Sequence, residues 1–239
     1  MRLSRRTTAA GLALALALCG CGSDGAVDAT ESNTALIRDP LTRNRFSVPA
    51  QWERQDAVWL AWWVAPYGGP DYRIEDLVVE MARALAPRVP VNLVVQDATE
   101  EAMVRPILAR AGVDLTRVHF VRIPHNDFWM RDTGGIFTRN PAGEVSVVDF
   151  GYNFWGYDRY TSPYSQHDER IDRDVAESLG ITAYRCSIIH EGGGTDVDGR
   201  GTAIVTEAVE LQRNPFMTRL EIDYELRRCY GVRQVIWLP

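Results

Sequence analysis

Apolar runs of strand length alternate with helix-period segments along most of this chain, and this alternation limits the folds open to it. The run AVWLAWW at 57–63 comes first, and VNLVVQ at 91–96 and VHFVRI at 118–123 follow. Between the first two runs, apolar residues recur at the spacing of one helical face: Ile74, Leu77, Val78, Met81 and Leu85. A second helix is expected between Thr99, as its N-cap, and Gly112. The pattern predicts an α/β fold.

The second half of the chain continues the alternation. The segment IFTRNPAGEVSVVDF at 136–150 is typical of a hairpin, because Asn-Pro-Ala-Gly separates two strand-like runs. The further elements expected are helices near 168–179 and 217–229 and strands at 183–189, 202–206 and 232–238. A repeated ββαβ unit would account for this rhythm.

The first 21 residues have the pattern of an export signal. A basic start precedes an apolar run from Ala9 to Leu18 that is too short to span a bilayer comfortably. The sequence Leu-Cys-Gly-Cys at 18–21 resembles a bacterial lipobox, with Cys21 as the residue that is lipidated; a plain cleaved signal peptide is the alternative. Either reading predicts an exported protein, as a lipoprotein anchored in the cell envelope or as a periplasmic or extracellular protein.

Residues 22–45 are small, polar and acidic in their first part and predict a flexible tether, so the folded domain is expected over 46–239. The formal net charge is −6, and no run of basic residues follows the first six positions. A nucleic-acid partner is therefore not expected, and partners should be small or cationic. Without the signal, Cys186 and Cys229 remain, either as one bridge or as two core thiols.

Two stretches carry candidate chemistry. Trp129, Arg131 and Asp132 lie in NDFWMRDTGGIF, at a strand end, where sites in α/β folds usually lie. Glu191 follows an apolar strand and precedes three glycines, so the backbone there can approach a ligand closely. The structural alternatives are an Arg131–Asp132 ion pair in the first stretch and a solvated acid in a glycine turn in the second.

Other site types find little support. Asp196, Asp198, Gly201 and Glu207 match positions of a calcium loop, but Arg200 replaces an expected ligand and the flanks are strand-like. The sequence contains neither a G-x-S-x-G elbow nor an H-E-x-x-H motif. His125 and His190 are expected to be hydrogen-bonded structural residues. No metal and no cofactor is predicted.

Two carboxylates at separate strand ends with a Trp nearby suit a guanidinium. This group is flat, permanently charged and presents a fork of N–H donors that carboxylates hold in bidentate fashion. An aromatic face beside it adds about 0.5 to 2 kcal/mol of cation–π attraction.

Four blocks in this order resemble the agmatine deiminase and bacterial peptidyl-arginine deiminase family: VPAQWERQDAVWLAWW at 48–63, FWMRDTGGIF at 128–137, EGGGTDVDGRGTAIVTE at 191–207, and RNP at 213–215 with a helix running into VIWLP. The resemblance implies a pentein fold, a five-bladed α/β propeller, and hydrolysis of a guanidino group to a ureido group with release of ammonia. It implies that Asp132 and Glu191 grip the guanidinium and that Trp129 lines the substrate channel.

The resemblance also implies a Cys nucleophile and a His-x-Asp block beyond a VIWLP-like strand, and the sequence to Pro239 contains neither block. About three of five blades are therefore expected, with Cys186 and Cys229 as core residues. Three hypotheses follow. The chain is an exported guanidino hydrolase whose sequence here is incomplete, a non-catalytic lipoprotein that binds guanidinium groups, or an inactive truncated remnant. Export favours peptidyl-arginine as substrate, whereas agmatine hydrolysis usually serves putrescine synthesis inside the cell.

Overall fold

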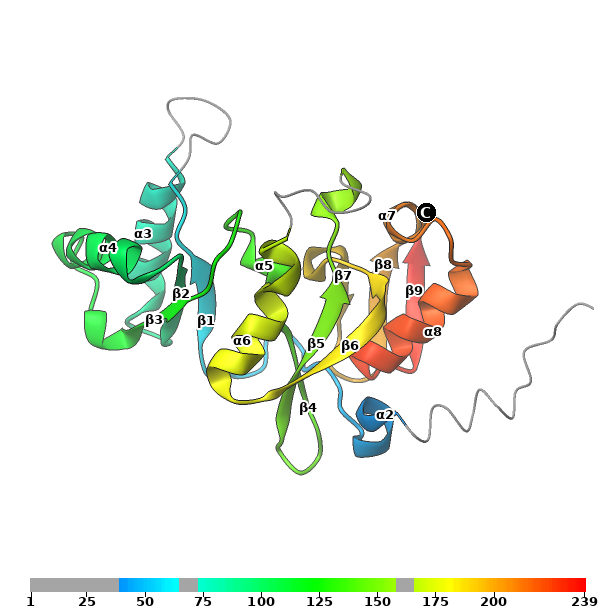
Figure 1. Ribbon diagram of the computed structural model, residues 1–239. Helices are drawn as coiled ribbons and strands as arrows, with labels where there is room; N and C mark the ends of the chain where they lie inside the picture. The colour runs from blue at the N-terminus through cyan, green and yellow to red at the C-terminus, as the bar shows by residue number, and fades with distance from the viewer. Residues whose placement is uncertain (1–38, 65–72, 158–165) are drawn as a thin grey trace, which may run out of the picture.

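The computed structural model describes residues 39–64, 73–157 and 166–239. The expected signal peptide, the lipidation site Cys21 and most of the expected tether lie outside the described residues. Three sheets of three strands each follow one another across the molecule (Figure 1). The protein is therefore α/β, as the alternation predicts.

The first sheet has the order β1-β2-β3, and all its strands are parallel. Its elements are β1 (Val58–Ala61), α3 (Ile74–Leu85), β2 (Val91–Val95), α4 (Ala98–Arg110) and β3 (Val118–Arg122), with the 3-10 turn η1 (Leu115–Arg117) before β3. It is a βαβαβ unit and not the expected ββαβ unit, because a crossover helix, and not a hairpin, joins β1 to β2.

Two local predictions in this unit were wrong. Asp97, not Thr99, caps α4, because its carboxylate accepts hydrogen bonds from the backbone N–H groups of Thr99 and Glu100. The buried face of α3 consists of Ile74, Val78, Val79 and Ala82. Leu77 and Met81, which were expected on the buried face, are exposed, and Val79 and Ala82 are buried in their place.

The second and third sheets both have the expected ββαβ plan. The second contains β4 (Ile136–Arg139), β5 (Val145–Gly151), the turn η3 (Asp168–Arg170), α6 (Ile171–Leu179) and β6 (Thr182–Ile189), and η2 (Phe154–Gly156) follows β5. The third contains β7 (Thr195–Val197), β8 (Thr202–Thr206), α7 (Glu207–Arg213), α8 (Arg219–Tyr230) and β9 (Gln234–Leu238). In each sheet the first pair is antiparallel and the second is parallel. The sequence predicted neither β7 nor α7.

Two short helices lie outside this repeat. α2 (Pro40–Asn44) lies within the segment expected to be a tether, yet it buries Leu41 and contacts α8. The Asp39 carboxylate, which caps α2, also accepts a 2.9 Å hydrogen bond from Arg228. Folded structure is therefore present before Phe46. The other short helix is α5 (Met130–Thr133), between the first two sheets (Figure 1).

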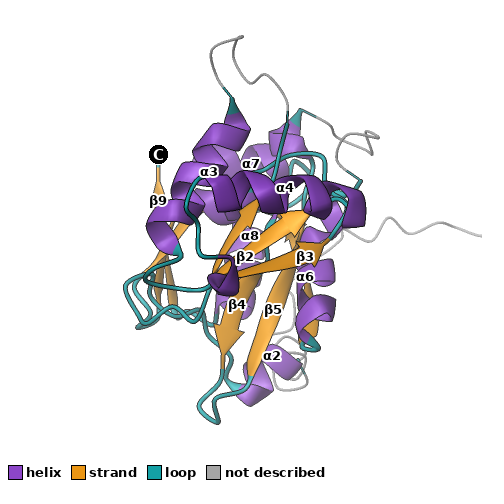
Figure 2. Cartoon of the chain, turned by 90° about the vertical axis from the view of Figure 1, so that its left-hand side faces the viewer, coloured by secondary structure: helices purple, strands orange, loops and turns teal. Residues whose placement is uncertain are grey.

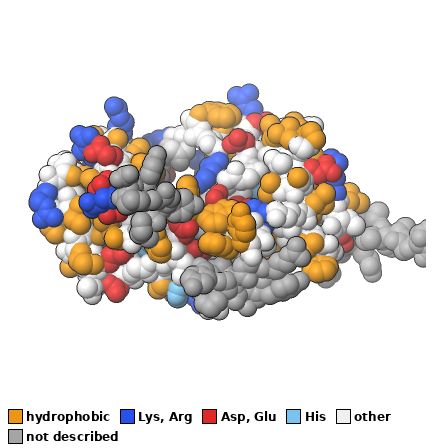
Figure 3. Space-filling model, turned by 90° about the horizontal axis from the view of Figure 1, so that it is seen from above, with side chains coloured by type: hydrophobic (Ala, Val, Ile, Leu, Met, Phe, Trp, Pro, Cys, Tyr) orange, Lys and Arg blue, Asp and Glu red, His pale blue; other side chains and the backbone are white. Residues whose placement is uncertain are grey.

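Apolar packing joins the sheets. One core cluster lies between the first sheet and the helices α3 and α4, which both views place on the same side of the strands (Figures 1 and 2). A second cluster joins the second and third sheets through α8, and a smaller one packs α6 against the first sheet. No helix in the described part of the chain is long and apolar enough to cross a membrane. Seen from above, acidic and basic side chains are interspersed over the surface (Figure 3).

Candidate functional site

Asp132 lies in α5, between the first and second sheets, and its carboxylate has two donors from distant parts of the chain. Its Oδ1 accepts a 3.0 Å hydrogen bond from the backbone N–H of Gly193, and its Oδ2 accepts one of 3.0 Å from Trp155 Nε1. Arg131 does not pair with it: the guanidinium of Arg131 lies 3.7 Å from Asp196 on the exposed surface. The structural alternative of an Arg131–Asp132 ion pair is therefore wrong.

The glycines after Glu191 are needed for this contact. They form the turn η4 (Gly192–Gly194), which contacts α5. A Cβ on Gly193 would lie 2.1 Å from Asp132 Oδ1, and one on Gly192 would lie 2.6 Å from the carbonyl oxygen of Arg131. Only glycine lets the backbone come this near to Asp132 and Arg131. The sequence predicted a close approach to a ligand at these glycines, which stays a prediction.

Glu191 immediately precedes this turn and is buried, with 4% of its surface exposed. Its Oε1 accepts a 2.6 Å hydrogen bond from Nε of Arg213, at the end of α7. Burial raises the pKa of Glu191, and the Arg213 guanidinium opposes that rise. The charge of Asp132 adds to the rise in pKa, so the two carboxylates influence each other. Glu191 is therefore not the solvated acid of the structural alternative.

Two residues that sequence reasoning did not select hold these carboxylates. Trp155 lies in η2 with a φ of 54°, an unusual value for a Trp, and this conformation accompanies its bond to Asp132. A Cβ on Gly156 would lie 3.0 Å from Nη1 of Arg213, so the backbone of η2 packs against the arginine that binds Glu191. The RNP block at 213–215 is the only sequence signal for Arg213. The stretch YNFWG at 152–156 carries no signal for Trp155, because only the contact with Asp132 shows its role.

Both histidines considered from the sequence are buried and hydrogen-bonded. His190 Nδ1 lies 3.0 Å from the carboxylate of Glu210, and its Nε2 lies 2.8 Å from the hydroxyl of Tyr230. His125 lies with Nδ1 2.8 Å from the carbonyl of Ile123 and Nε2 2.8 Å from the carbonyl of Trp62. These contacts agree with structural roles.

Further acids surround the site. Asp127 and Asp168 are both buried, and burial raises the pKa of each, that of Asp168 to about 6. The pKa of the Tyr152 hydroxyl is raised first by burial and then by the charges of Asp168, Glu191, Asp127 and Asp132. Four carboxylates therefore influence one phenol, which favours cations in this region. Trp129 precedes α5, with its ring centroid 4.4 Å from that of Phe128, and its role in a substrate channel stays a prediction.

Three separate hollows lie around the site residues. A small cavity of about 10 Å³ is lined by Asp132, Tyr152, Asp168, His190 and Gly192 among others. A larger hollow of about 210 Å³ lies beside Arg213 and Asn214, and another of about 250 Å³ lies beside Gly192, Thr195 and Tyr230. None of these three contains both site carboxylates in its lining. Because Arg213 already binds Oε1 of Glu191, a guanidinium bound to Glu191 would share that carboxylate with Arg213.

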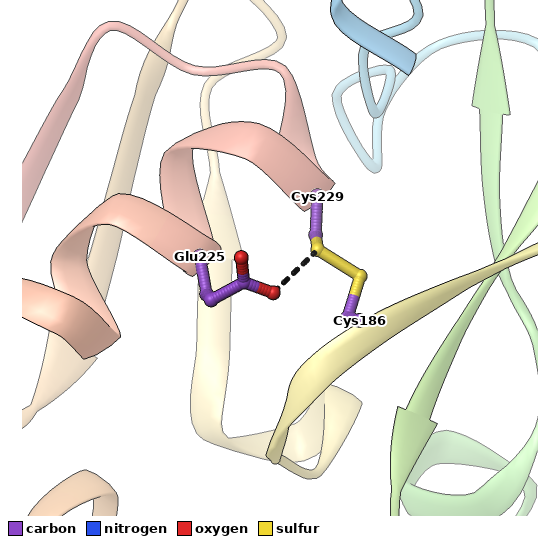
Figure 4. Close-up of side chains that lie close together, drawn as sticks. All are labelled: Cys186, Glu225 and Cys229. Carbon is purple, nitrogen blue, oxygen red and sulfur yellow. Dashed lines mark hydrogen bonds between the residues drawn. A yellow bond between two sulfur atoms is a disulfide. The ribbon is translucent and has the colours of Figure 1, made fainter. Parts of the chain in front are cut away.

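The remaining candidates do not form a metal site. Asp198 of the calcium-loop pattern accepts hydrogen bonds from the backbone N–H groups of Arg200 and Thr202, so its carboxylate stabilises a turn. Cys186 and Cys229 are joined in a disulfide inside the second core cluster, which decides between the two alternatives left open by the sequence (Figure 4). Glu225 lies close to these sulfurs, but disulfide sulfurs are not the thiolates that bind metals. Neither Cys186 nor Cys229 is a nucleophile in this state.

The described residues form an α/β protein with two ββαβ sheets, and the solved structures that it resembles include agmatine deiminases, which have the pentein fold. Residues 47–239 match the family model of the Porphyromonas-type peptidyl-arginine deiminases, and the chain belongs to this family of hydrolases. It is 36% identical over 203 residues to the agmatine deiminase of Pseudomonas fluorescens and 36% identical over 214 residues to that of Ectopseudomonas mendocina, covering 81% and 86% of this chain. The agmatine deiminase of Enterococcus faecalis has a similar structure, with a TM-score of 0.72 and 27% identity over 84% of this chain.

The resemblance predicted from the four sequence blocks is thereby confirmed. The matched region covers 53% of the P. fluorescens protein, 56% of the E. mendocina protein and 55% of the E. faecalis chain. The chain therefore spans about half the length of the relatives it matches.

Proposed function

We propose that this chain binds a guanidino group between Asp132 and Glu191 and supplies the binding half of a deiminase site. The observation that carries the proposal is the joining of the two acidic segments: Gly193, two residues after Glu191, donates its N–H to the carboxylate of Asp132. The two carboxylates are thus fixed relative to each other by the fold. Their remaining oxygen lone pairs suit the N–H fork of a guanidinium.

The reaction proposed for the whole protein is hydrolysis of the guanidino group to a ureido group and ammonia. A Cys thiolate attacks the guanidinium carbon, ammonia leaves, and water hydrolyses the amidino thioether and returns the thiolate. In the described residues, Cys186 and Cys229 are bonded to each other, so the nucleophile is not one of these two. The names of the relatives support agmatine, and the family model supports peptidyl-arginine, as the substrate.

Equilibrium binding to the full chain tests the proposal. Agmatine and N-acetyl-arginine amide should bind, whereas 1,5-diaminopentane, which has an ammonium in place of the guanidinium, should bind at least about tenfold more weakly, because it lacks the planar donor fork. Tighter binding of the amide than of agmatine would select the peptidyl substrate. Equal affinity for agmatine and the diamine would contradict a guanidinium site.

We also propose that the chain is exported and lipidated on Cys21. The Leu-Cys-Gly-Cys sequence supports this proposal, and so does a disulfide in the core, since disulfides form and persist mainly in oxidising compartments. Labelling with an alkyne fatty acid in the bacterial host should mark the wild type and Cys19→Ser but not Cys21→Ser. Label on Cys21→Ser, or none on the wild type, would contradict lipidation at this residue.

A further inference from the structure

Two polar groups of the small cavity have no hydrogen-bond partner in the described structure. Asp168 is 1% exposed, and its Oδ1 accepts a 2.6 Å hydrogen bond from the backbone N–H of Asn126, but its Oδ2 is buried without a partner. The hydroxyl of Tyr152, a residue 7% exposed, is also buried without a partner. Both residues line the same cavity. Buried polar groups are nearly always satisfied, so a small hydrogen-bonding species is expected between them.

The cavity fits only a small species. Its volume of about 10 Å³ is close to the roughly 10 to 15 Å³ that one water molecule needs by the same measure. A guanidinium is too large for it. An ammonium ion has nearly the size of water and carries four N–H donors, whereas Asp168 Oδ2 and the Tyr152 oxygen can both accept.

The charges around the cavity favour a cation over water. The carboxylates of Asp127, Asp132, Asp168 and Glu191 all act on the Tyr152 hydroxyl. The groups that oppose them are Arg213, which is paired with Glu191, the ring of His125, which acts on Asp127 and Asp168, and the ring of His190, which lines the cavity and acts on Glu191.

Two more acids line the cavity. Glu169 is paired with Arg173 and Arg185, so its charge is already compensated. Burial, together with the neighbouring charge of Asp149, raises the pKa of Asp172 well above its usual range, so this carboxyl adds less negative charge than an ordinary carboxylate. The carboxylates on this side of the site still outnumber the cations that face them.

We propose that this cavity is a binding site for one ammonium ion, which donates hydrogen bonds to Asp168 Oδ2 and to the Tyr152 hydroxyl oxygen. The cavity also borders Asp132, so the ion lies beside the proposed guanidinium site. Hydrolysis of a guanidino group releases ammonia, which takes up a proton to become this ion. The role as a product site rests on the proposed function, whereas ammonium binding itself does not.

The test is the thermal stability of the full chain in ammonium, potassium and tetramethylammonium chloride at equal ionic strength. A ligand that binds only the folded state stabilises it by RT ln(1 + L/Kd), where L is the free ligand concentration, so the melting temperature rises with ligand concentration. Potassium matches ammonium in size but donates no hydrogen bond, and tetramethylammonium is too large for the cavity. The expected result is a concentration-dependent rise in ammonium alone. An equal rise in all three salts, or in ammonium and potassium, would overturn the proposal.

Three variants locate the effect. Asp168→Asn keeps the shape of the side chain and removes its charge, and Tyr152→Phe removes only the hydroxyl. Both should lose the rise in ammonium, and each serves if the other does not fold. The exposed acid Glu80, which pairs with Arg83 on the surface, provides the control Glu80→Gln, which should behave as the wild type. An ammonium-specific rise retained in both cavity variants would refute the assignment.

The outcome is separable from that of the proposed function. Agmatine binding that persists without any ammonium-specific effect would refute the ammonium site alone. An ammonium effect without agmatine binding would refute the guanidinium site alone.

Discussion

Replacement of Arg213 should expose how strongly the fold depends on the ion pair with Glu191. Both side chains are buried, with exposures of 8% and 5%, and 2.6 Å separates Nε from Oε1. Removing one partner of a buried pair leaves an uncompensated charge and costs about 3 to 5 kcal/mol. Arg213→Met should lower the free energy of unfolding by this amount at pH 8, as measured by urea denaturation followed by Trp fluorescence.

The loss should depend on pH. The pKa of Glu191 in the folded protein is raised by burial, so its contribution to stability is present below the unfolded pKa and is lost as pH rises through the folded pKa. Without Arg213 the folded pKa rises further, because the group that opposed the rise is gone. The deficit of Arg213→Met should therefore shrink as pH falls from 8 through the raised pKa of Glu191, because a protonated Glu191 needs no cation.

Two further variants make the test specific. Glu191→Gln in the Arg213→Met background should restore part of the lost stability, since both charges are then removed. Arg227→Met is the control: it breaks a pair with Asp223 in which Arg227 is half exposed, and it should cost at most about 1 kcal/mol. A deficit at pH 8 no larger than that of the control, or one independent of pH, would refute the reasoning.

Three more predictions follow from single contacts. Gly193→Ala should weaken agmatine binding at least about tenfold, because its Cβ would lie 2.1 Å from Oδ1 of Asp132. Gly194→Ala is the control and should bind as the wild type, because its Cβ would lie 3.7 Å from its nearest neighbour. Equal affinities of the two variants in calorimetry would contradict the close approach. Reduction of the Cys186–Cys229 disulfide, which spans 43 residues, should lower the free energy of unfolding by about 4 kcal/mol, measured by urea denaturation with and without reductant. Alkylation of Cys186 and Cys229 in the unreduced protein, located by peptide mass spectrometry, would contradict the bridge. Burial raises the pKa of Asp168 to about 6, so its contribution to the free energy of unfolding should fall as pH rises from 4 to 6 in ammonium-free buffer. Asp168→Asn should remove about 3 kcal/mol of this pH dependence. The same dependence of the free energy of unfolding on pH in the wild type and Asp168→Asn would refute this prediction.

The sequence predicts the elements of the fold well where periodicity is strong. The hairpin β4–β5 and the helices α6 and α8 lie where the apolar runs and turn residues indicate. It misses β7 and α7 because β7 has only three residues and α7 only seven, too few for a visible periodicity. The all-parallel first sheet was also missed, since strand pairing is set by tertiary packing that periodicity does not record.

The site residues, like the elements of the fold, could be predicted only in part from the sequence. Asp132 and Glu191 are recognisable because each ends an apolar run beside glycines or aromatic residues. Their partners Trp155 and Arg213 are not, because the bonds to them cross more than twenty residues of chain. The cavity at Asp168 could not be predicted at all: its two unpartnered groups come from different elements, and only their burial reveals them.

The most direct test of the central claim is a double-mutant cycle of agmatine binding, measured by calorimetry on the wild type, Asp132→Asn, Glu191→Gln and the double variant. Each single change removes a charged hydrogen bond worth about 1.5 to 3 kcal/mol, so each Kd should rise roughly 10- to 100-fold. Because both carboxylates hold the same ligand, the double variant should lose less than the sum of the two single losses. Asp196→Asn, an exposed acid near the site, should leave Kd unchanged. Agmatine binding with an unchanged Kd in both single variants would contradict a guanidinium site between Asp132 and Glu191.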